Sequence, residues 1–229
     1  MSRRELVTVQ EAAARLQISA DAVRKQVTAG HLPAEWRGRQ WWLDRQAVER
    51  AARQRRSQGP PLSPRMAWAA LLLASGDEEG AIRAVERPRY RSRVRAWLRA
   101  HSLVEHAWRL RARATVEQFD AHPSELPRLL DRPDVLRTGI SAGEIVGLVG
   151  GRTSAAELYA PASRRQTLID EHALAPGTGA VRIRWVPDEI WPLLDDDDDG
   201  DAPRAAILLD LLEQDDPRAR REAIRELSR

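Results

Sequence analysis

The chain has 229 residues, 42% of them hydrophobic and 31% charged, so it can bury a core, and its lack of cysteine excludes disulfides, thiol catalysis and cysteine-ligated zinc. No apolar run approaches the roughly 20 residues of a membrane span and no signal-like leader is present, so we expect a cytoplasmic protein that does not enter a membrane. The net charge of +3 conceals an asymmetry: residues 1–117 hold 23 basic and 12 acidic residues, which favours phosphate binding, whereas residues 118–229 hold 14 and 22, which argues against DNA contacts over the whole molecule.

The first predicted elements are two short helices joined by a tight turn. Thr8 and Glu11 have the spacing of a capping box, which predicts that a helix begins just after Thr8. Ser19 is a typical N-cap for a second helix over residues 20–29. This pattern predicts a helix-turn-helix whose second helix presents polar side chains to the major groove of DNA.

A hairpin and a third helix follow. Two short strands flank Arg37-Gly38-Arg39, where the glycine favours a tight turn and the arginines make the tip basic. Asp44 is a candidate N-cap for a helix over residues 45–56. Together these elements predict a winged helix-turn-helix domain over residues 1–57.

The same residues resemble the excisionase-like and MerR-like DNA-binding modules. The resemblance is carried by Thr8-Val9-Gln10-Glu11-Ala12-Ala13, Ile18-Ser19, Val23-Arg24-Lys25, Gly30-His31-Leu32-Pro33-Ala34 and Gly38-Arg39-Gln40-Trp41-x-Leu43. It implies that the second helix enters the major groove and that the hairpin reaches the backbone or the minor groove. The chain departs from the family pattern at Ala22, where threonine is frequent, and at Trp36 and Trp42, where arginine is frequent.

The candidate DNA interface consists of polar and basic side chains on the second helix and the hairpin. Its members are Ser19, Asp21, Arg24, Lys25, Thr28, Arg37, Arg39 and Gln40. A helix-turn-helix can instead bind protein, and Trp36 and Trp42 could form such an interface if they are exposed. The 12 basic and 6 acidic residues of residues 1–58 favour double-stranded DNA as the partner. Because one recognition helix reads few base pairs, we expect a homodimer or paired sites.

A proline-rich linker at residues 58–64 leads into a helical segment over residues 65–111. Ser63-Pro64 has the residue types of an N-cap and first turn, and the helix that follows, residues 65–75, is apolar on nearly all sides, which predicts burial. A further helix over residues 89–99 is dense in arginine. Its basic face is either solvated or in contact with phosphate, and both interpretations stay open.

From residue 112 strands and helices interleave, which predicts a compact α+β domain of three or four strands over residues 112–229. Strands are expected at residues 113–119, 135–140, 156–159 and 181–186, and helices at 123–130, 162–172, 204–212 and 217–227. The predicted fold class is therefore α+β: an N-terminal winged helix-turn-helix, a helical middle segment, and a C-terminal domain with a small sheet and two terminal helices.

Three later segments resemble actinobacterial regulators related to the AbiEi class of abortive-infection antitoxins. They are residues 61–68, 181–192 and 210–221. The resemblance implies that residues 112–229 bind a protein partner, that the chain represses its own operon, and that it neutralises a nucleotidyltransferase-like toxin.

We expect no catalytic residues, no metal and no cofactor. The aspartate run Asp195–Asp199 contains an Asp-x-Asp pattern used by two-metal transferases, but it lies in a predicted loop, where a solvated acidic run is the simpler interpretation. The glycine-rich stretch at residues 147–154 lacks the lysine of a phosphate loop, and the five histidines lack metal-site spacing. The alternatives are a phage-type excisionase or DNA-architectural factor and, less favoured, a metal-dependent nucleotidyl-transfer enzyme built on the aspartate run.

Overall fold

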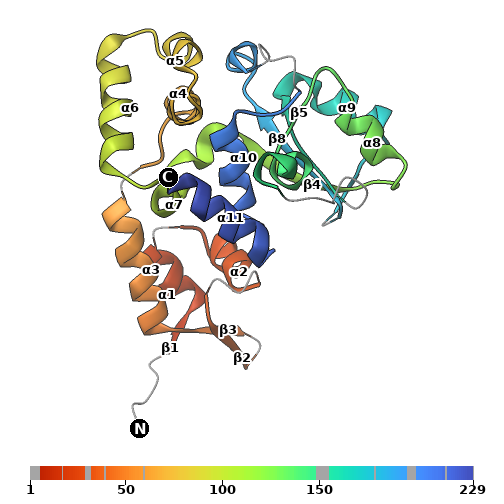
Figure 1. The fold of residues 1–229 in the computed structure, drawn as a ribbon. Helices are drawn as coiled ribbons and strands as arrows, with labels where there is room; N and C mark the ends of the chain where they lie inside the picture. Colours follow the sequence, from red (N-terminus) through yellow and green to blue (C-terminus); the bar gives the residue numbers. More distant parts are fainter. Residues whose placement is uncertain are drawn as a thin grey trace. The chain divides into compact units, whose positions relative to one another are not determined.

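The structure is a computed structural model, and Figure 1 shows its ribbon. It describes residues 6–16, 18–28, 32–38, 40–58, 60–147, 155–177, 179–194, 200–214 and 216–228, with the backbone alone for residues 50, 53–58, 145 and 146. Contacts divide the chain into an N-terminal unit, Met1–Pro60, and a C-terminal unit, Pro61–Arg229. The chain mixes helices and strands in both units, which confirms the predicted α+β class.

Within its described residues, the N-terminal unit contains three helices and a three-stranded antiparallel sheet in the order β1-β3-β2. In chain order its elements are β1 (Leu6–Thr8), α1 (Val9–Leu16), α2 (Ala20–Thr28), β2 (Ala34–Arg37), β3 (Gln40–Asp44) and α3 (Arg45–Gln58). The predicted two helices, hairpin and third helix are all present, with the hairpin projecting from the helices in Figure 1. The sequence did not predict β1, which pairs with β3 and closes the sheet.

Short-range hydrogen bonds set where the first two helices begin. The backbone N–H of Thr8 donates to Glu11 Oε2 at 2.8 Å, and the N–H of Glu11 donates to Thr8 Oγ1 at 3.2 Å, so the predicted capping box forms. The N–H of Ala22 donates to Ser19 Oγ at 3.1 Å, which confirms Ser19 as the N-cap of α2. The apolar sides of the helices then pack on the sheet in a core that includes Ala12, Leu16, Val23, Val27, Leu43 and Val48.

The C-terminal unit begins with helices. They are α4 (Pro64–Ser75), α5 (Glu78–Ala84), α6 (Pro88–Ala100) and α7 (Leu103–His106), followed by the 3-10 helix η1 (Ala107–Arg113). Ser63 caps α4 and Pro64 opens it, and six residues of α4 are buried, as predicted. Helix α5 was not predicted. It follows α4 directly because Gly76 ends α4 with a φ of 90° and Asp77 caps α5 through the N–H of Gly80 at 2.8 Å.

The rest of this unit contains a five-stranded sheet in the order β5-β6-β8-β4-β7, where three or four strands were expected. In chain order the elements are β4 (Thr115–Asp120), α8 (Glu125–Leu130), β5 (Leu136–Arg137), η2 (Gly139–Val146), β6 (Ala156–Pro161), η3 (Ala162–Arg164), α9 (Arg165–Glu171), β7 (Ala175–Pro176), β8 (Val181–Val186), η4 (Trp191–Leu193), α10 (Arg204–Leu211) and α11 (Pro217–Leu227). Strands β6 and β8 are parallel, and the other pairs are antiparallel. The strand expected over residues 135–140 is wrong beyond Arg137, because Gly139 adopts a φ of 52° and opens a 3-10 helix instead.

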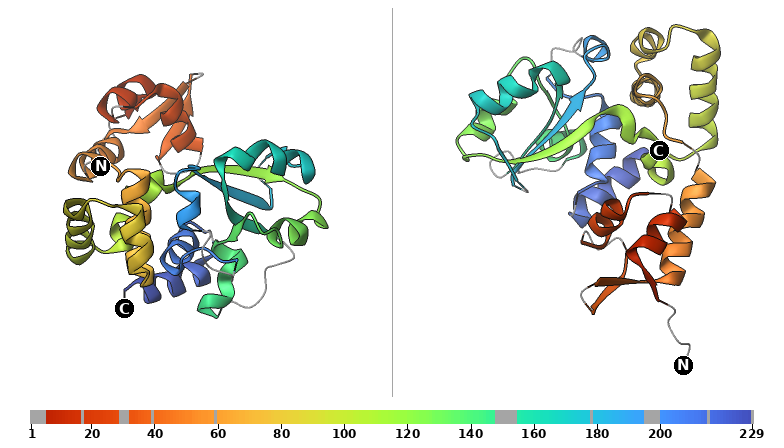
Figure 2. Two further views of the ribbon diagram at one scale, coloured as in Figure 1. Left: turned by 90° about the horizontal axis from the view of Figure 1, so that it is seen from above. Right: turned by 180° about the vertical axis from the view of Figure 1, so that it is seen from behind.

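The two faces of this sheet pack against different helices, as Figures 1 and 2 show. Alternate residues of β6 and β8, such as Leu158 and Ile183, pack in one core with Leu129 of α8 and Leu168 of α9. Residues of the opposite parity, such as Tyr159, belong to a second core. That core also contains apolar residues of α4, α10 and α11, so helices from both ends of the unit share one interior.

Buried charges join α10 to its face of the sheet. Asp210 on α10 is fully buried, and its Oδ1 lies 2.5 Å from Arg113 Nη2 and 3.0 Å from Arg184 Nε. The hydroxyl of Thr138 donates to Asp210 Oδ2 at 2.6 Å. Glu213 lies 3.1 Å from Arg113 and 3.0 Å from Arg184. Burial alone would raise the pKa of Asp210, but Arg184 and Arg113 outweigh it, and the pKa lies below its usual value.

Replacing Asp210 with asparagine leaves two buried guanidinium groups without the carboxylate that they share. Removing one partner of a buried ion pair costs about 3–5 kcal/mol, and we expect the free energy of unfolding to fall by that amount in urea titrations followed by circular dichroism. The control is Arg128→Ala, because the Arg128 side chain is 72% exposed and its pair with Glu125 is worth at most about 1 kcal/mol. Equal stabilities of the two variants would show that the buried charges do not hold α10 in place.

The capping box makes the N-terminal unit sensitive to acid. Hydrogen bonds from the N–H and hydroxyl of Thr8 lower the pKa of Glu11 below its ordinary value of 4.5. The carboxylate therefore stabilises the fold at pH values above the unfolded-state pKa, and this contribution is lost as the pH falls through the folded-state pKa. We expect Glu11→Gln to lower the melting temperature at pH 7 and the difference from the wild type to vanish toward pH 3. The exposed Glu105→Gln serves as control; a Glu11→Gln deficit that persists unchanged at low pH would contradict the prediction.

Candidate nucleic-acid interface

The structure describes seven of the eight predicted interface residues and places them on α2, on its N-cap and on the hairpin. Ser19 caps α2; Asp21, Arg24, Lys25 and Thr28 are exposed on it; Arg37 ends β2 and Gln40 begins β3. Arg39 lies outside the described residues. Val23 and Val27 occupy the opposite side of α2 and are buried, so the amphipathic pattern turns the polar residues outward.

The exposed face of α2 carries an ion pair and a lysine. Arg24 Nη1 lies 2.5 Å from Asp21 Oδ1, with the two side chains 55% and 83% exposed. An exposed pair of this kind is worth about 0–1 kcal/mol, so the guanidinium of Arg24 can exchange Asp21 for another acceptor at little cost. No acidic residue in the described ranges pairs with Lys25. The hydroxyl of Thr28 donates to the carbonyl of Arg24 at 3.0 Å, which leaves its oxygen as an acceptor.

A surface hollow of about 290 Å³ brings α2 and the hairpin together. Its lining residues come from the start of α1, from α2 and from both strands of the hairpin: Thr8, Val9, Gln10, Arg24, Trp36, Gln40 and Trp41. Two predicted interface residues, Arg24 and Gln40, therefore share one site. The start of α1 and Trp36 were not predicted to belong to it, because the fold alone brings them beside α2.

Trp36 is the most exposed large apolar side chain among the described residues, at 60%. The hairpin register places it opposite Trp41, and the two rings meet edge to face with centroids 5.0 Å apart. Trp41 packs against the core, so it holds the ring of Trp36 in place at the surface. This pair could have been predicted from the sequence, because residues at equal distances from the tip of a hairpin lie opposite each other on its two strands.

The other face of the hairpin forms a second hollow of about 400 Å³. Leu6, Arg37, Gly38, Gln40 and Trp42 line it, and Arg37 forms an ion pair with Glu35 on the same strand. Trp42 is half-buried, opposite Glu35 on one side and Thr8 on the other. Of the two tryptophans that could have formed a protein interface, only Trp36 is therefore exposed.

The described residues contain no group of three or more histidine, aspartate or glutamate side chains placed to hold a metal ion. The aspartate run Asp195–Asp199 and residues 148–154 of the glycine-rich stretch lie outside the described residues. None of the helices in the described ranges has the length and apolar composition needed to span a bilayer.

Comparison with protein families agrees with this geometry. Residues 6–56 match the family model of a helix-turn-helix domain. The match begins at β1 and ends inside α3, so it covers the two helices, the hairpin and both hollows and stops before the C-terminal unit. No curated protein and no solved structure matched the chain. The N-terminal unit is a helix-turn-helix domain, and its family supports DNA binding.

Proposed function

We propose that this protein is a transcription regulator that binds double-stranded DNA in a sequence-specific manner through its N-terminal unit. Helix α2 enters the major groove and the hairpin acts as a wing. The observation that carries the proposal is the hollow in which Arg24, Gln40 and the exposed ring of Trp36 meet beside the polar face of α2.

Four side chains of the proposed interface supply donors or positive charge for DNA. The guanidinium of Arg24 can donate two hydrogen bonds to a guanine edge after it leaves Asp21. Lys25 and Arg37 supply charge for backbone phosphates, and the amide of Gln40 can donate to a phosphate or a base. The start of α1 makes no phosphate site, because the carboxylate of Glu11 already accepts a hydrogen bond there.

A finer proposal concerns regulation and partners. We propose that the protein binds its operator as a homodimer, represses its own operon, and neutralises a nucleotidyltransferase-like toxin through residues 112–229. The support for the toxin is the resemblance of residues 181–192 and 210–221 to AbiEi-related regulators, together with the acidic balance of residues 118–229. Co-purification of the full chain with the product of the adjacent gene tests this proposal, and a failure to associate removes the antitoxin role without affecting DNA binding.

The alternative is a DNA-bending factor of the excisionase type, because a helix-turn-helix domain serves both functions. The two proposals differ in DNA geometry: a circular-permutation assay reports a strong bend only for the architectural factor. The 169 residues of the C-terminal unit favour a regulator with a second activity over a factor that consists of little more than its DNA-binding module.

Substitutions at Arg24 and Arg37 test the interface. In salt-titrated gel shifts on the DNA upstream of the gene, we expect Arg24→Ala to weaken specific binding by about 1–3 kcal/mol, since it removes a base contact. Arg37→Ala should weaken binding to operator and scrambled DNA alike and flatten the salt dependence, and the sequence predicts the same for Arg39→Ala. Arg128→Ala, on α8, is the control. Wild-type titrations for all of these variants would place the interface elsewhere and favour a protein-binding role for the helix-turn-helix.

Substitutions at Trp36 test whether its ring contacts DNA. Covering the exposed half of the ring is worth roughly 1 kcal/mol, so Trp36→Ala should weaken binding about fivefold in fluorescence anisotropy, whereas Trp36→Phe keeps most of the contact. Ile82→Ala removes another exposed apolar side chain, 41% exposed in the C-terminal unit, and should change nothing. Unchanged affinity of Trp36→Ala would show that the ring stays in solvent when DNA binds.

A further inference from the structure

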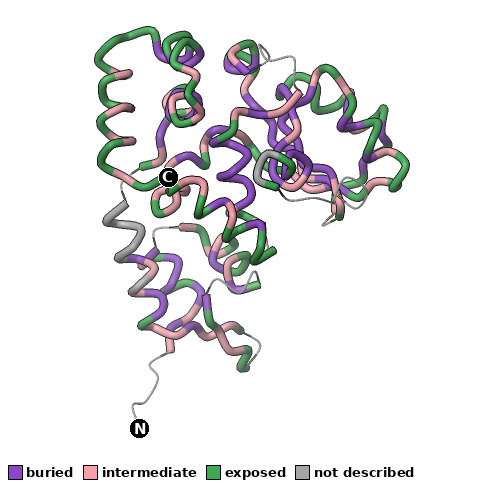
Figure 3. The backbone as a smooth tube through the Cα atoms, viewed as in Figure 1, coloured by how far each residue is buried: buried purple, intermediate pink, exposed green. Residues whose placement is uncertain are grey.

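Helix α6 of the C-terminal unit carries an unusual concentration of positive charge. Its 13 residues include five arginines and no acidic residue. Val94 is buried and Trp97 and Leu98 pack against the unit's core, which fixes the side of the helix that faces inward. The outward side is exposed along its length, as Figure 3 shows.

The five arginines divide into two groups. Arg91 donates to the carbonyl of Val85 at 3.0 Å, and Arg95 forms an ion pair with Glu78, so both serve the local fold. Arg89, Arg93 and Arg99 are exposed, and no acidic side chain in the described part of the chain pairs with them. We call these three residues the arginine face.

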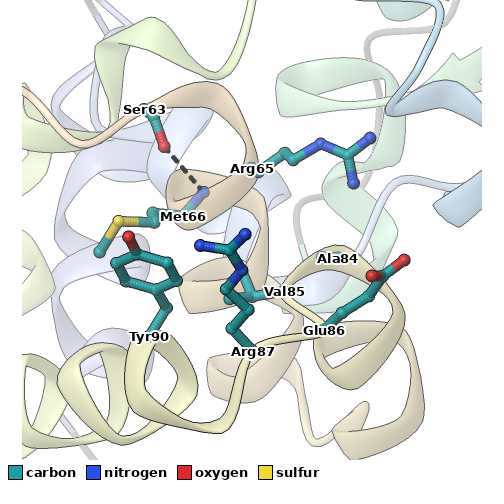
Figure 4. A pocket seen from close by; sticks show the side chains of 8 residues that line it. All are labelled: Ser63, Arg65, Met66, Ala84, Val85, Glu86, Arg87 and Tyr90. Carbon is teal, nitrogen blue, oxygen red and sulfur yellow. Dashed lines mark hydrogen bonds between the residues drawn. The ribbon is translucent and has the colours of Figure 1, made fainter.

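A pocket of about 540 Å³ lies between the first turns of α4 and α6, at one end of the arginine face. Its lining residues, drawn in Figure 4, are Ser63, Arg65, Met66, Ala84, Val85, Glu86, Arg87 and Tyr90. Figure 4 shows Arg87 and Tyr90 side by side below Met66. Neither Arg65 nor Arg87 pairs with a carboxylate of the described residues, and Arg89 Nη2 donates to the hydroxyl of Tyr90 at 3.1 Å.

The charges in this region oppose the ordinary electrostatic rules for helices. The N-terminus of a helix favours anions, yet neither α4 nor α6 has an acidic residue in its first turn, and arginines stand there instead. Arg89 and Arg93 are four residues apart on one face, a like-charged spacing that destabilises a helix. Arg89 and Arg87 also lower the pKa of the Tyr90 hydroxyl. An anion bound over this region would offset the arginines at the two helix N-termini, the repulsion between Arg89 and Arg93, and the positive charge beside Tyr90.

We propose that the arginine face and the pocket at its end bind backbone phosphates of double-stranded DNA, so that the C-terminal unit contributes to DNA affinity. From Arg87 to Arg99 the helix rises about 18 Å, at 1.5 Å per residue. Over that length one DNA strand carries about five phosphates, at 3.4 Å each along the axis, so the cations match a polyanion better than a single small phosphate ester. This inference rests on the proposed function, because the duplex is the polyanion that the N-terminal unit is proposed to bind.

Helix α11 provides a matched comparison. It exposes four arginines, of which Arg225 pairs with Glu222. The other three, Arg218, Arg220 and Arg221, share the helix with Glu222 and Glu226, and Asp216 caps it. Acidic residues therefore lie among the arginines of α11, whereas the arginine face of α6 contains none; Glu86 lines the pocket at its end, and Glu78 is already paired with Arg95. Replacing each set of three arginines by alanine removes the same net charge from the same unit.

The test compares the full-length wild type with two variants, Arg89→Ala/Arg93→Ala/Arg99→Ala and Arg218→Ala/Arg220→Ala/Arg221→Ala, on operator DNA over a range of salt concentrations. Alanine has the highest helix propensity, so we expect both variants to keep the circular dichroism spectrum of the wild type. Each lost phosphate contact reduces the slope of log K against log salt by about 0.9, so the α6 variant should have a slope shallower by about 2 to 3. We also expect at least tenfold weaker binding for the α6 variant in low salt, and less than a twofold change for the α11 variant.

The outcomes separate this inference from the proposed function. If the wild type binds its operator and the α6 variant keeps the wild-type slope, or if both variants lose affinity equally, the inference is overturned while the proposed function stands. If the α6 variant loses affinity but Arg24→Ala does not, the arginine face binds DNA and the proposed reading by α2 fails. A rise in melting temperature with inorganic phosphate that Arg87→Ala abolishes, together with an unchanged salt slope, would identify a small-anion site and overturn the DNA assignment.

Discussion

The C-terminal unit depends on one buried carboxylate. Asp210 is the shared partner of Arg113, at the end of the first helical segment, and of Arg184, in the middle of the sheet, so one side chain connects parts of the chain that lie 97 and 26 residues away. Apolar contacts between α10 and the sheet would permit several helix registers. The ion pairs of this carboxylate with two guanidinium groups and the hydrogen bond that the Thr138 hydroxyl donates to it can all form in only one of them. We therefore interpret the buried charges as fixing the register of α10 more than adding net stability.

Several polar side chains of the N-terminal unit serve the fold. Thr8, Glu11 and Ser19 are engaged in helix caps, and the Thr28 hydroxyl donates to its own helix. The long side chains Arg24, Lys25 and Gln40 and the ring of Trp36 take no part in these caps, and they are the groups that we propose for the contact with DNA. A small core fixes the backbone of the unit. Its exposed cations lose little free energy when they exchange solvent or a weak ion pair for a ligand.

Local signals explain what could be predicted from the sequence. The capping box at Thr8, the Ser63-Pro64 start of α4 and the alternation over residues 181–186 each depend on neighbours within a few residues, and all three are present in the structure. The two-residue strand β7 was not predicted, because two residues beside a longer strand carry no alternating pattern of their own, and β5 was predicted too long, because the turn at Gly139 ends it. Arg113 was placed at the start of a strand, yet it ends a 3-10 helix and is anchored by Asp210, a contact beyond the reach of any local pattern. Likewise the hollow beside α2 needs the register of the hairpin, which aligns Trp36 with Trp41.

Net charge is a poor guide to where this protein can meet an anion. Residues 61–229 hold 28 acidic and 25 basic residues, which taken alone argues against a phosphate-binding surface in the C-terminal unit. Many of the acids lie on or beside the sheet and are already paired with arginine, as in Glu117 with Arg165 and Asp134 with Arg132. At physiological salt a phosphate senses exposed charges within about 8 Å, so an approaching duplex responds to the local surplus on α6 and not to the sum over the unit. A C-terminal unit with a net acidic balance can therefore contain a basic helix, because many of its acids are paired with arginine and α6 itself has no acidic residue.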